Sequence, residues 1–574
     1  MTLLLSSATE VKITLYLRQK PAVPDENGVF LSLSFPNRSW LLPSVFALPF
    51  VVVPPLLFHF YPVPFWTAGE AEWLGLAGAM NMAYRLADFK MYSALAMSGH
   101  PGVPFYFMSW LALALSGLPV ATSDGFFNAV LGRLVEYQTM NIWLAAIVGA
   151  AGIFIFTREA RKLVPAWVIA AGLLLWISST PWTLLSFVSP MNETFGMLIN
   201  ALFFLALVRI SDDENFLPWT SILAASVSAF GYLNKLSFIN VGLALAFASA
   251  VAFLVRGASM RQMARSAALF NGVCFGVILF VGIFIIGWNE FLALLRFHKD
   301  VILGSGTYGE GDHVVVSGSK LLDAVRSIPV DKVYCMAIAP ILGAVLLAGG
   351  FLTIAVRGRE QLAVALIAIG AGTAAVLATA SVLKHYDGHY TSAVSPTLPA
   401  CMVALYLLAN AWNLRSRTVW ALVSIAAIAL TARETPAALA DNFKSRIDLN
   451  AHAMADLRDI EALPLDKNAS MAFTYRAPFS YFGEGFIVYF ACVPRLTAEY
   501  HRNRPRMFSA NAADSPPRKI GAVVIHKPYF PTVESIKTAS NLMQFGEPLT
   551  WREGDRLAKL RTVFVLLRGA GEQP

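Results

Sequence analysis

The chain has 574 residues, of which 56% are hydrophobic and only 14% are charged, and its net charge is +8. Soluble globular proteins carry about 25% charged residues, so this composition excludes an ordinary soluble domain. The positive charge does not indicate nucleic acid, because the basic residues stand in short clusters between apolar runs. The sequence therefore predicts an integral membrane protein that contacts membrane lipids and binds no nucleic acid. Four cysteines follow no metal or redox spacing: Cys274, Cys335, Cys401 and Cys492.

Apolar runs of near-membrane length recur along most of the chain. A helix that crosses a bilayer needs about 20 mainly apolar residues. We therefore expect an all-α polytopic fold with about eleven transmembrane helices. The expected spans are 39–60, 141–157, 164–182, 194–210, 218–233, 238–256, 267–288, 335–356, 361–383, 391–412 and 418–432.

The basic connections between these runs predict the orientation. The short connections 158–162, 256–265, 357–359 and 415–417 all carry Lys or Arg, which concentrate on the cytoplasmic side of membrane proteins. All four can face the cytoplasm if the apolar stretch 103–119 does not cross the membrane. Its glycines and prolines favour an interfacial or re-entrant helix.

This orientation divides the chain into three expected parts. Residues 1–38 form a cytoplasmic N-terminal segment. Residues 39–432 form the transmembrane domain, whose first extracytoplasmic loop spans 61–140. Residues 433–574 form a soluble domain outside the membrane. Most residues that could perform chemistry then lie on the extracytoplasmic side.

The C-terminal region has a different composition, with charges throughout and short apolar runs. Their pattern predicts buried strands at 471–475, 520–526 and 562–567 and a helix at 533–542. A small α/β domain is expected. Neither a nucleotide-binding loop of the G-x-G-x-x-G type nor a P-loop occurs in this C-terminal region.

The first expected loop carries three carboxylates beside the membrane, Glu70, Glu72 and Asp88. A carboxylate in this position can act as a general base toward an acceptor hydroxyl. Each can also be a solvated loop charge. His100 follows, at a Pro- and Gly-rich helix break, and could contact a substrate or be a structural turn residue.

Charged residues also lie next to the central apolar runs. Glu193 is at the expected outer end of one span, and Lys235 stands between two apolar runs. A charge at such a depth is costly unless it snorkels to the interface or has a function. The polar, Gly-rich loop that contains Tyr308 and His313 can order over a ligand or serve as a flexible connector.

The densest cluster of functional side chains follows the expected span 361–383. It consists of Lys384, His385, His389 and Tyr390. Cations and phenols at the membrane–water boundary suit a lipid phosphate or pyrophosphate head group. The simpler interpretation is an aromatic belt that carries charge.

These motifs, taken in order, resemble the GT-C superfamily of membrane glycosyltransferases, in the branch of protein O-mannosyltransferases and aminoarabinose transferases. The resemblance spans roughly residues 40–412. It rests on an acidic first loop, on the pair His100-Pro101, on Lys235 between two apolar runs, and on Lys384 followed by His389-Tyr390. The family's Asp-Glu pair is matched by Gly69-Glu70, so its Asp is missing here.

The resemblance implies a sugar transfer from a polyprenyl-phosphate donor to an extracytoplasmic glycan, lipid or protein acceptor, with inversion. It also implies the inner (plasma) membrane of a bacterium. Lys235, Lys384 and His389 would then offset the charge that grows on the leaving phosphate. No cofactor is predicted, and metal dependence stays open because no ligand spacing is present. Two alternatives remain: a transporter or flippase, and a non-catalytic membrane scaffold.

Overall fold

The structure is a computed structural model. It describes residues 40–62, 70–86, 102–117, 126–304, 318–384, 386, 388–413, 417–463, 470–473, 500, 502, 507–509, 520–527, 532–538 and 554–568. Within these ranges, the side chains of 70–72, 84–86, 126–128, 318–321, 324, 417–435, 470, 472–473, 507–509, 520–521, 526 and 537–538 fall outside the description.

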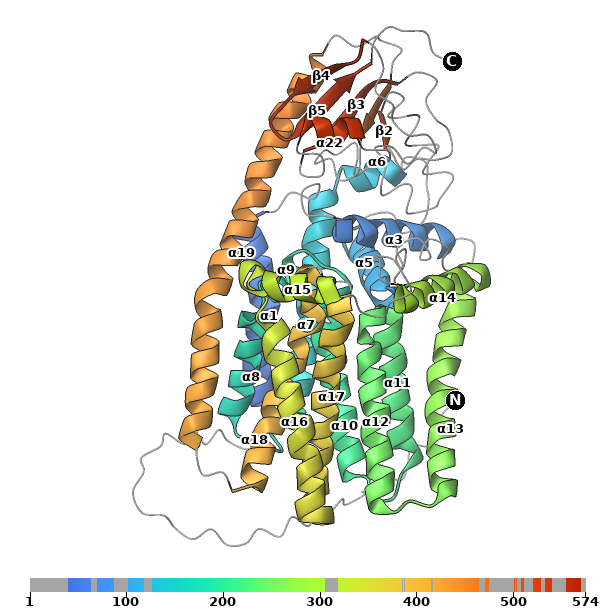
Figure 1. Ribbon diagram of the computed structural model, residues 1–574. Coiled ribbons are helices and arrows are strands. Elements are labelled where there is room, and N and C mark those ends of the chain that lie inside the picture. Colours follow the sequence, from blue (N-terminus) through green and yellow to red (C-terminus); the bar gives the residue numbers. More distant parts are fainter. Residues whose placement is uncertain are drawn as a thin grey trace, which may run out of the picture. The chain divides into compact units, whose positions relative to one another are not determined.

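The described residues are mainly helical (Figure 1). In chain order the helices and helical turns are α1 (Leu41–Phe60), α3 (Glu70–Leu86), α5 (Val103–Leu115), α6 (Phe126–Leu131), α7 (Leu134–Ala160), α8 (Ala166–Ser178), α9 (Trp182–Val188), η1 (Asn192–Phe195), α10 (Gly196–Asp212), α11 (Pro218–Asn234), η2 (Leu236–Phe238), α12 (Ile239–Arg256), α13 (Met260–Phe280), η3 (Val281–Ile286), α14 (Trp288–Leu303), α15 (Gly318–Asp331), α16 (Cys335–Arg357), η4 (Gly358–Gln361), α17 (Leu362–Lys384), η5 (Gly388–Ala393), η6 (Ser395–Thr397), α18 (Leu398–Ala411), α19 (Arg417–Glu461) and α22 (Val533–Thr538).

The membrane character of the chain is clear from its long apolar helices. Among the described residues, seven segments are long and apolar enough to cross a bilayer, and eight if the bent pair α8 and α9 forms one span. The protein is thus an all-α polytopic membrane protein in this region. The seven segments are Leu41–Phe60, Leu134–Ala160, Asn192–Asp212, Leu236–Arg256, Met260–Ile286, Cys335–Lys384 and Gly388–Ala411.

The expected number of eleven spans is therefore not reached. The run 218–233 became α11, which has only 17 residues. The run 164–182 breaks between α8 and α9, whose axes differ by 78°. The runs 335–356 and 361–383 fall in one segment, in which α16 and α17 are joined by η4 and pack against each other. Residues 418–432 belong to α19, where their side chains are outside the description.

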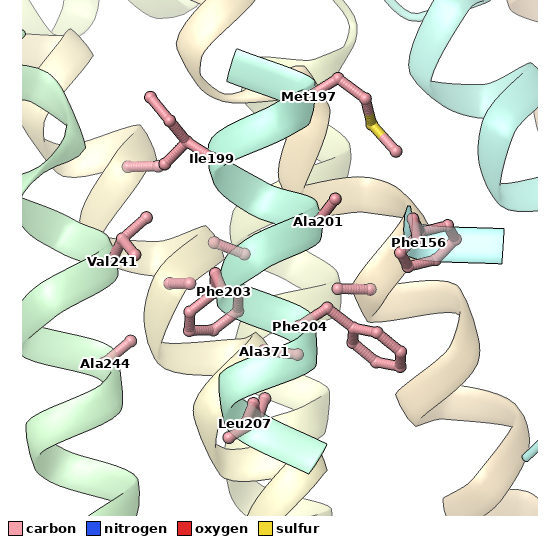
Figure 2. Close-up of a cluster of buried hydrophobic side chains, with 14 of the residues drawn as sticks. Phe156, Met197, Ile199, Ala201, Phe203, Phe204, Leu207, Val241, Ala244 and Ala371 are labelled. Carbon is pink, nitrogen blue, oxygen red and sulfur yellow. The ribbon is translucent and has the colours of Figure 1, made fainter. Parts of the chain in front are cut away.

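Helix α10 lies in the middle of the helical bundle. Lipid tails are as apolar as leucine, so tight packing rather than escape from water holds such helices together. Small residues allow that packing: a Cβ on Gly152 of α7 would lie 2.7 Å from the backbone nitrogen of Leu198. Phe156 of α7 packs on Phe204 of α10 at 5.1 Å between ring centroids. Figure 2 shows α10 side chains directed at several neighbouring helices, including Met197, Ile199, Phe203 and Leu207, with Val241 and Ala244 of α12 nearby.

The region between α1 and α7 contains short helices. Helix α5 has 13 apolar residues, too few to cross a bilayer alone. It begins after Gly102, whose φ of 58° is a left-handed conformation that favours glycine. Helix α3 packs on α5 so closely that a Cβ on Gly78 would lie 2.1 Å from the Tyr106 ring. Helices α3 and α5 of the first loop therefore form one packed unit.

The C-terminal region contains a five-stranded sheet, which agrees with the expected small α/β domain. Its order is β2-β1-β3-β5-β4, with the first three strands parallel and the last pairs antiparallel. Three strands match the predicted runs, whereas β2 and β4 were not predicted. Helix α22 covers the first part of the helix predicted at 533–542, and residues 539–542 lie outside the described residues. The strands are β1 (Ser470–Phe473), β2 (Met507–Ser509), β3 (Ile520–His526), β4 (Arg556–Lys559) and β5 (Val563–Leu567).

Helix α19 has 45 residues and continues past the boundary that was expected at 432/433. Asp456, near its end, has no exposed side-chain surface and binds the turn before β5. Its carboxylate accepts hydrogen bonds from the amide of Arg561 at 2.9 Å and from the hydroxyl of Thr562 at 2.6 Å. The long helix is thereby joined to the sheet.

Candidate functional site

The site is built at a helix break that contains Lys235. Helix α11 ends at Asn234, and Lys235 is extended, with φ −162° and ψ 144°. The short turn η2 then leads into α12. The Lys235 side chain is only 6% exposed. Because a buried ammonium ion loses its hydration, it requires a counter-charge or several hydrogen-bond partners.

Glu193 supplies that counter-charge. It lies in η1, the turn that precedes α10, and its side chain is 2% exposed. The Lys235 ammonium donates a hydrogen bond to Glu193 Oε1. Removing one partner of such a pair leaves an uncompensated buried charge, which is strongly unfavourable. The pair therefore fixes the end of α11 against the start of α10.

An aromatic cluster from η5 covers the same lysine. The Lys235 nitrogen lies 4.1 Å from the centroid of the Tyr390 ring, a cation–π distance. The His389 ring lies 4.0 Å from the Tyr390 ring and 6.1 Å from the Trp182 ring, measured between ring centroids. Thr391 holds η5 to the α8–α9 bend by a 3.1 Å hydroxyl contact with Thr180. The Lys235 cation thus contacts the Tyr390 ring, which His389 connects to Trp182 at the α8–α9 bend.

The first loop reaches this site through its backbone. The amide of Gly102, the residue before α5, donates a 3.1 Å hydrogen bond to the carbonyl oxygen of Asn234. Asn234 Nδ2 in turn donates to the carbonyl oxygen of Asn192 at 2.7 Å. Chain segments from the first loop, η1 and the α11–α12 break are therefore joined beside Lys235.

Several polar atoms around the ion pair lack a hydrogen bond to any described residue. They are Oδ1 of Asn192, Oδ1 of Asn234 and Oγ of Ser237, all inaccessible to solvent. Buried polar atoms in native proteins nearly always have a partner, which can be a ligand or an ordered water. Each of the three lies within two residues of Glu193 or Lys235. This arrangement is typical of a site that receives a polar ligand.

The structure brings only part of the predicted cluster together. His389, Tyr390, Lys235 and Glu193 meet, whereas Lys384 does not join them. The Lys384 ammonium instead donates to the carbonyl oxygen of Ile302, at the end of α14. Helix α17 ends at Lys384 and η5 begins at Gly388. A place for Lys384 beside a donor phosphate stays a prediction.

The side chains of the remaining predicted site residues fall outside the description. Glu70 and Glu72 are in the first turn of α3, where the helix dipole favours negative charge, but their side chains are outside the description. Five further predicted residues lie outside the described residues altogether: Asp88, His100, Tyr308, His313 and His385.

Sequence reasoning missed the amides and the indole of the site. Asn192 directly precedes Glu193, and Asn234 directly precedes Lys235. This repeated pattern of an asparagine before a charged residue could have predicted that the two amides belong to the site. Trp182 follows Pro181 at the α8–α9 bend, and only the bend brings it to His389.

Metal binding has no support in the described region. No group of three or more His, Cys, Asp or Glu side chains there is arranged to hold a metal ion. The cation that the site offers to an anionic ligand is Lys235.

Comparison with protein family models, with curated proteins and with solved structures finds no match to this chain. The site must therefore be interpreted from its own chemistry.

Proposed function

We propose that the protein is a glycosyltransferase that moves a sugar from a polyprenyl-phosphate donor to an acceptor outside the cytoplasm. The observation that supports this most is the buried Lys235 beside unpartnered polar atoms, at a break in a membrane bundle. Interrupted helices inside a membrane protein commonly surround a polar ligand. A lipid phosphate meets both requirements, because its anion suits the lysine and its chain suits the bilayer.

The donor phosphate would bind between Lys235 and His389. Its oxygen would accept a hydrogen bond from the Lys235 ammonium, which retains Glu193 as a second partner. The unpartnered atom Ser237 Oγ could donate to the same phosphate. As the bond between sugar and phosphate breaks, negative charge grows on the phosphate, and a cation held in advance stabilises that charge.

The acceptor would approach from the first loop. One carboxylate among Glu70, Glu72 and Asp88 would take the proton of the acceptor hydroxyl, and the oxygen would attack the anomeric carbon in a single inverting displacement. Helix α3, which begins at Glu70, packs on α5, and α5 starts at the Gly102 contact with Asn234. This chain of contacts supports a first loop that acts together with Lys235.

The orientation belongs to the same proposal. The basic connections would face the cytoplasm of a bacterium, with the site and the C-terminal sheet on the outer side of the inner membrane. A reporter enzyme fused after residue 574 should be active only outside the cytoplasm. Activity inside would contradict this orientation.

A transporter for a polar or lipid-linked substrate is the second candidate. The unpartnered polar atoms and the interrupted helices favour it as well, because transporters bind substrates at such breaks. The two candidates differ in chemistry: only a transferase cleaves the bond between sugar and phosphate.

Donor binding tests the proposed site. Purified protein should bind a polyprenyl-phosphate sugar, and the double variant Glu193→Gln/Lys235→Gln should bind it at least about tenfold more weakly, since a charge-assisted hydrogen bond contributes about 1.5–3 kcal/mol. Arg296→Gln, on the exposed side of α14, is the charge control and should bind normally. Equal donor affinity in all three proteins would contradict the site.

A further inference from the structure

The two asparagines beside the buried ion pair carry oxygen atoms that receive no hydrogen bond from a described residue. These atoms are Oδ1 of Asn192 and Oδ1 of Asn234, and both are inaccessible to solvent. Asn234 is fully buried, and only 9% of the Asn192 surface is exposed. A buried acceptor without a donor is costly, because it has lost its hydrogen bonds to water. The two oxygens therefore favour a ligand that brings donors.

The orientation of the Asn234 amide follows from its surroundings. Its Nδ2 donates a 2.7 Å hydrogen bond to the backbone carbonyl oxygen of Asn192. The reversed amide would place two carbonyl oxygens against each other, and neither of them can donate. Oδ1 of Asn234 therefore lies on the side of the amide that faces away from the Asn192 carbonyl. The same bond holds the two asparagines next to each other.

Both asparagines stand at breaks between helices, where a ligand can meet the chain. Asn192 begins η1, and Asn234 is the last residue of α11. The Asn234 carbonyl oxygen also accepts from the Gly102 amide at 3.1 Å. The unsatisfied amide oxygens therefore lie on the side of Lys235 where the first loop reaches the site. In the proposed function this is the side from which the acceptor approaches.

The donors of the site already have other tasks. An ammonium group has three N–H donors. The Lys235 ammonium donates to Glu193 and lies over the Tyr390 ring. In the proposed function, the donor phosphate binds the same ammonium and the Ser237 hydroxyl. The oxygens of Asn192 and Asn234 thus need hydrogen-bond donors from another part of the ligand.

Neither the phosphate nor the lipid chain of such a ligand has these donors. The phosphate that joins a polyprenol to a sugar is a diester, which is ionised at neutral pH, so its oxygens only accept hydrogen bonds. The prenyl chain is a hydrocarbon. Each hydroxyl group of the sugar has one O–H donor, and the sugar is bonded directly to the phosphate. The sugar is therefore the part of the ligand that matches the two amide oxygens.

We propose that Oδ1 of Asn192 and Oδ1 of Asn234 accept hydrogen bonds from two neighbouring hydroxyl groups of the donor sugar. This assignment rests on the proposed function, because it takes the phosphate to lie at Lys235. A site that is built to bind a hydroxyl group rejects an analogue without it, since its own buried polar groups are then left unpaired. The two asparagines thus determine which sugar the protein accepts.

Equilibrium binding to the detergent-solubilised full chain tests this assignment. The probes are polyprenyl-phosphate glucose, mannose and galactose, and polyprenyl methyl phosphate, which has the same phosphodiester charge but no hydroxyl group. The wild type should bind at least one sugar probe about fivefold or more tightly than the methyl ester, since one neutral hydrogen bond strengthens binding roughly two- to tenfold. Deoxy analogues of that probe should bind about threefold more weakly when either of two neighbouring hydroxyl groups is missing.

Asn192→Leu removes one amide oxygen at nearly constant side-chain volume. It should reduce the preference for the sugar probe at least about threefold and leave the affinity for the methyl ester within about twofold. Asn192 is the residue to change, because the Asn234 amide also binds the Asn192 backbone. Asn200→Leu is the matched control and should keep the preference. Asn200 is equally buried, but it lies within α10, where its Nδ2 donates to the Gly196 carbonyl oxygen at 2.9 Å.

The outcomes separate this assignment from the proposed function. Equal affinity of the wild type for the methyl ester and the three sugar probes would overturn the assignment, as would a full sugar preference in Asn192→Leu. In both cases, weaker binding of all probes by Glu193→Gln/Lys235→Gln would still support the phosphate site. The deoxy analogues test the wild type without any substitution, so the assignment does not depend on the folding of a variant. Binding of no probe by the wild type would contradict the proposed function, and the assignment with it.

Discussion

The backbone amide of Gly102 donates a 3.1 Å hydrogen bond to the carbonyl oxygen of Asn234, the residue that precedes the buried Lys235. Asn234 is 132 residues away in the chain, so this bond connects the first loop to the break between α11 and α12. It gives the loop a fixed point beside Lys235 of the candidate site. A substitution at Gly102 should therefore also disturb the position of Lys235.

Gly102→Ala should reduce sugar transfer by at least about tenfold. Gly102 has a φ of 58°, and an added Cβ would lie 2.3 Å from the Tyr106 ring, so α5 has to shift. Gly117→Ala is the control, because Gly117 has a similar φ of 67° but its Cβ would meet only Arg133, at 3.9 Å. The measurement is the rate of sugar transfer by the wild type and by the two variants at matched protein levels. If both variants lose activity equally, backbone strain explains the loss and the contact does not.

Glu193→Gln should destabilise the protein by about 3–5 kcal/mol, because it leaves the buried Lys235 cation without its counter-charge. Glu193→Gln/Lys235→Gln should recover most of this stability, since two neutral amides can bind each other. Thermal unfolding of the three proteins measures the effect. A single variant as stable as the wild type would show that the pair is not buried in the membrane.

Acid should loosen the contact between α19 and the sheet. Burial alone would raise the pKa of Asp456, but the hydrogen bonds from Thr562 and Arg561 outweigh it and hold that pKa below its ordinary value of 3.8. A carboxylate with a lowered pKa stabilises the folded state above the ordinary value. That stabilisation is lost as the pH falls through the lowered pKa.

Asp456→Asn should therefore remove this part of the acid sensitivity and, at neutral pH, weaken the contact by about 1.5–3 kcal/mol. The strength of this contact is measured by hydrogen exchange of the backbone amides in Val563–Leu567. Asp459→Asn is the control, because Asp459 is half exposed and its ion pair with a described residue is with Arg561 alone. Identical exchange in Asp456→Asn and the wild type at neutral pH would refute the contact.

Gly152→Ala should destabilise the bundle by about 1–3 kcal/mol, because its Cβ would lie 2.7 Å from the backbone of Leu198 and α7 and α10 would have to separate. Gly276→Ala is the matched control on α13, where a Cβ meets nothing within 4 Å. Thermal unfolding in detergent compares the two. Equal unfolding temperatures would mean that α7 and α10 do not pack this closely.

Composition and hydropathy predicted the membrane class and the α/β tail, because both depend on local patterns that survive in the fold. The number of spans could not be read in the same way. An apolar run such as 164–182 is continuous in sequence, yet Pro181 and its neighbours bend it sharply. Hydropathy records composition and does not record such bends.

The site was partly predictable for a related reason. Lys235 and Glu193 are conspicuous because charges are rare beside apolar runs. The meeting of Lys235 with Tyr390 depends on two helix breaks that no local pattern specifies. Lys384 is equally conspicuous, but its contact with Ile302 depends on where α14 ends. The sequence was enough to predict that these residues are polar and functional candidates. Which groups their side chains contact could be identified only from the fold.

Turnover of a polyprenyl-phosphate sugar by the purified protein tests the proposed function most directly. The measurement is release or transfer of labelled sugar, with a panel of donor sugars and matched amounts of folded protein. The wild type should turn over one donor, and Lys384→Gln should stay within about threefold, since the Lys384 ammonium binds the Ile302 carbonyl oxygen. The folded double variant Glu193→Gln/Lys235→Gln should lose at least about a hundredfold, as expected when a preorganised charge is removed from a leaving group. Undiminished turnover in the double variant, or no turnover of any donor by the wild type, would contradict the role assigned to Lys235.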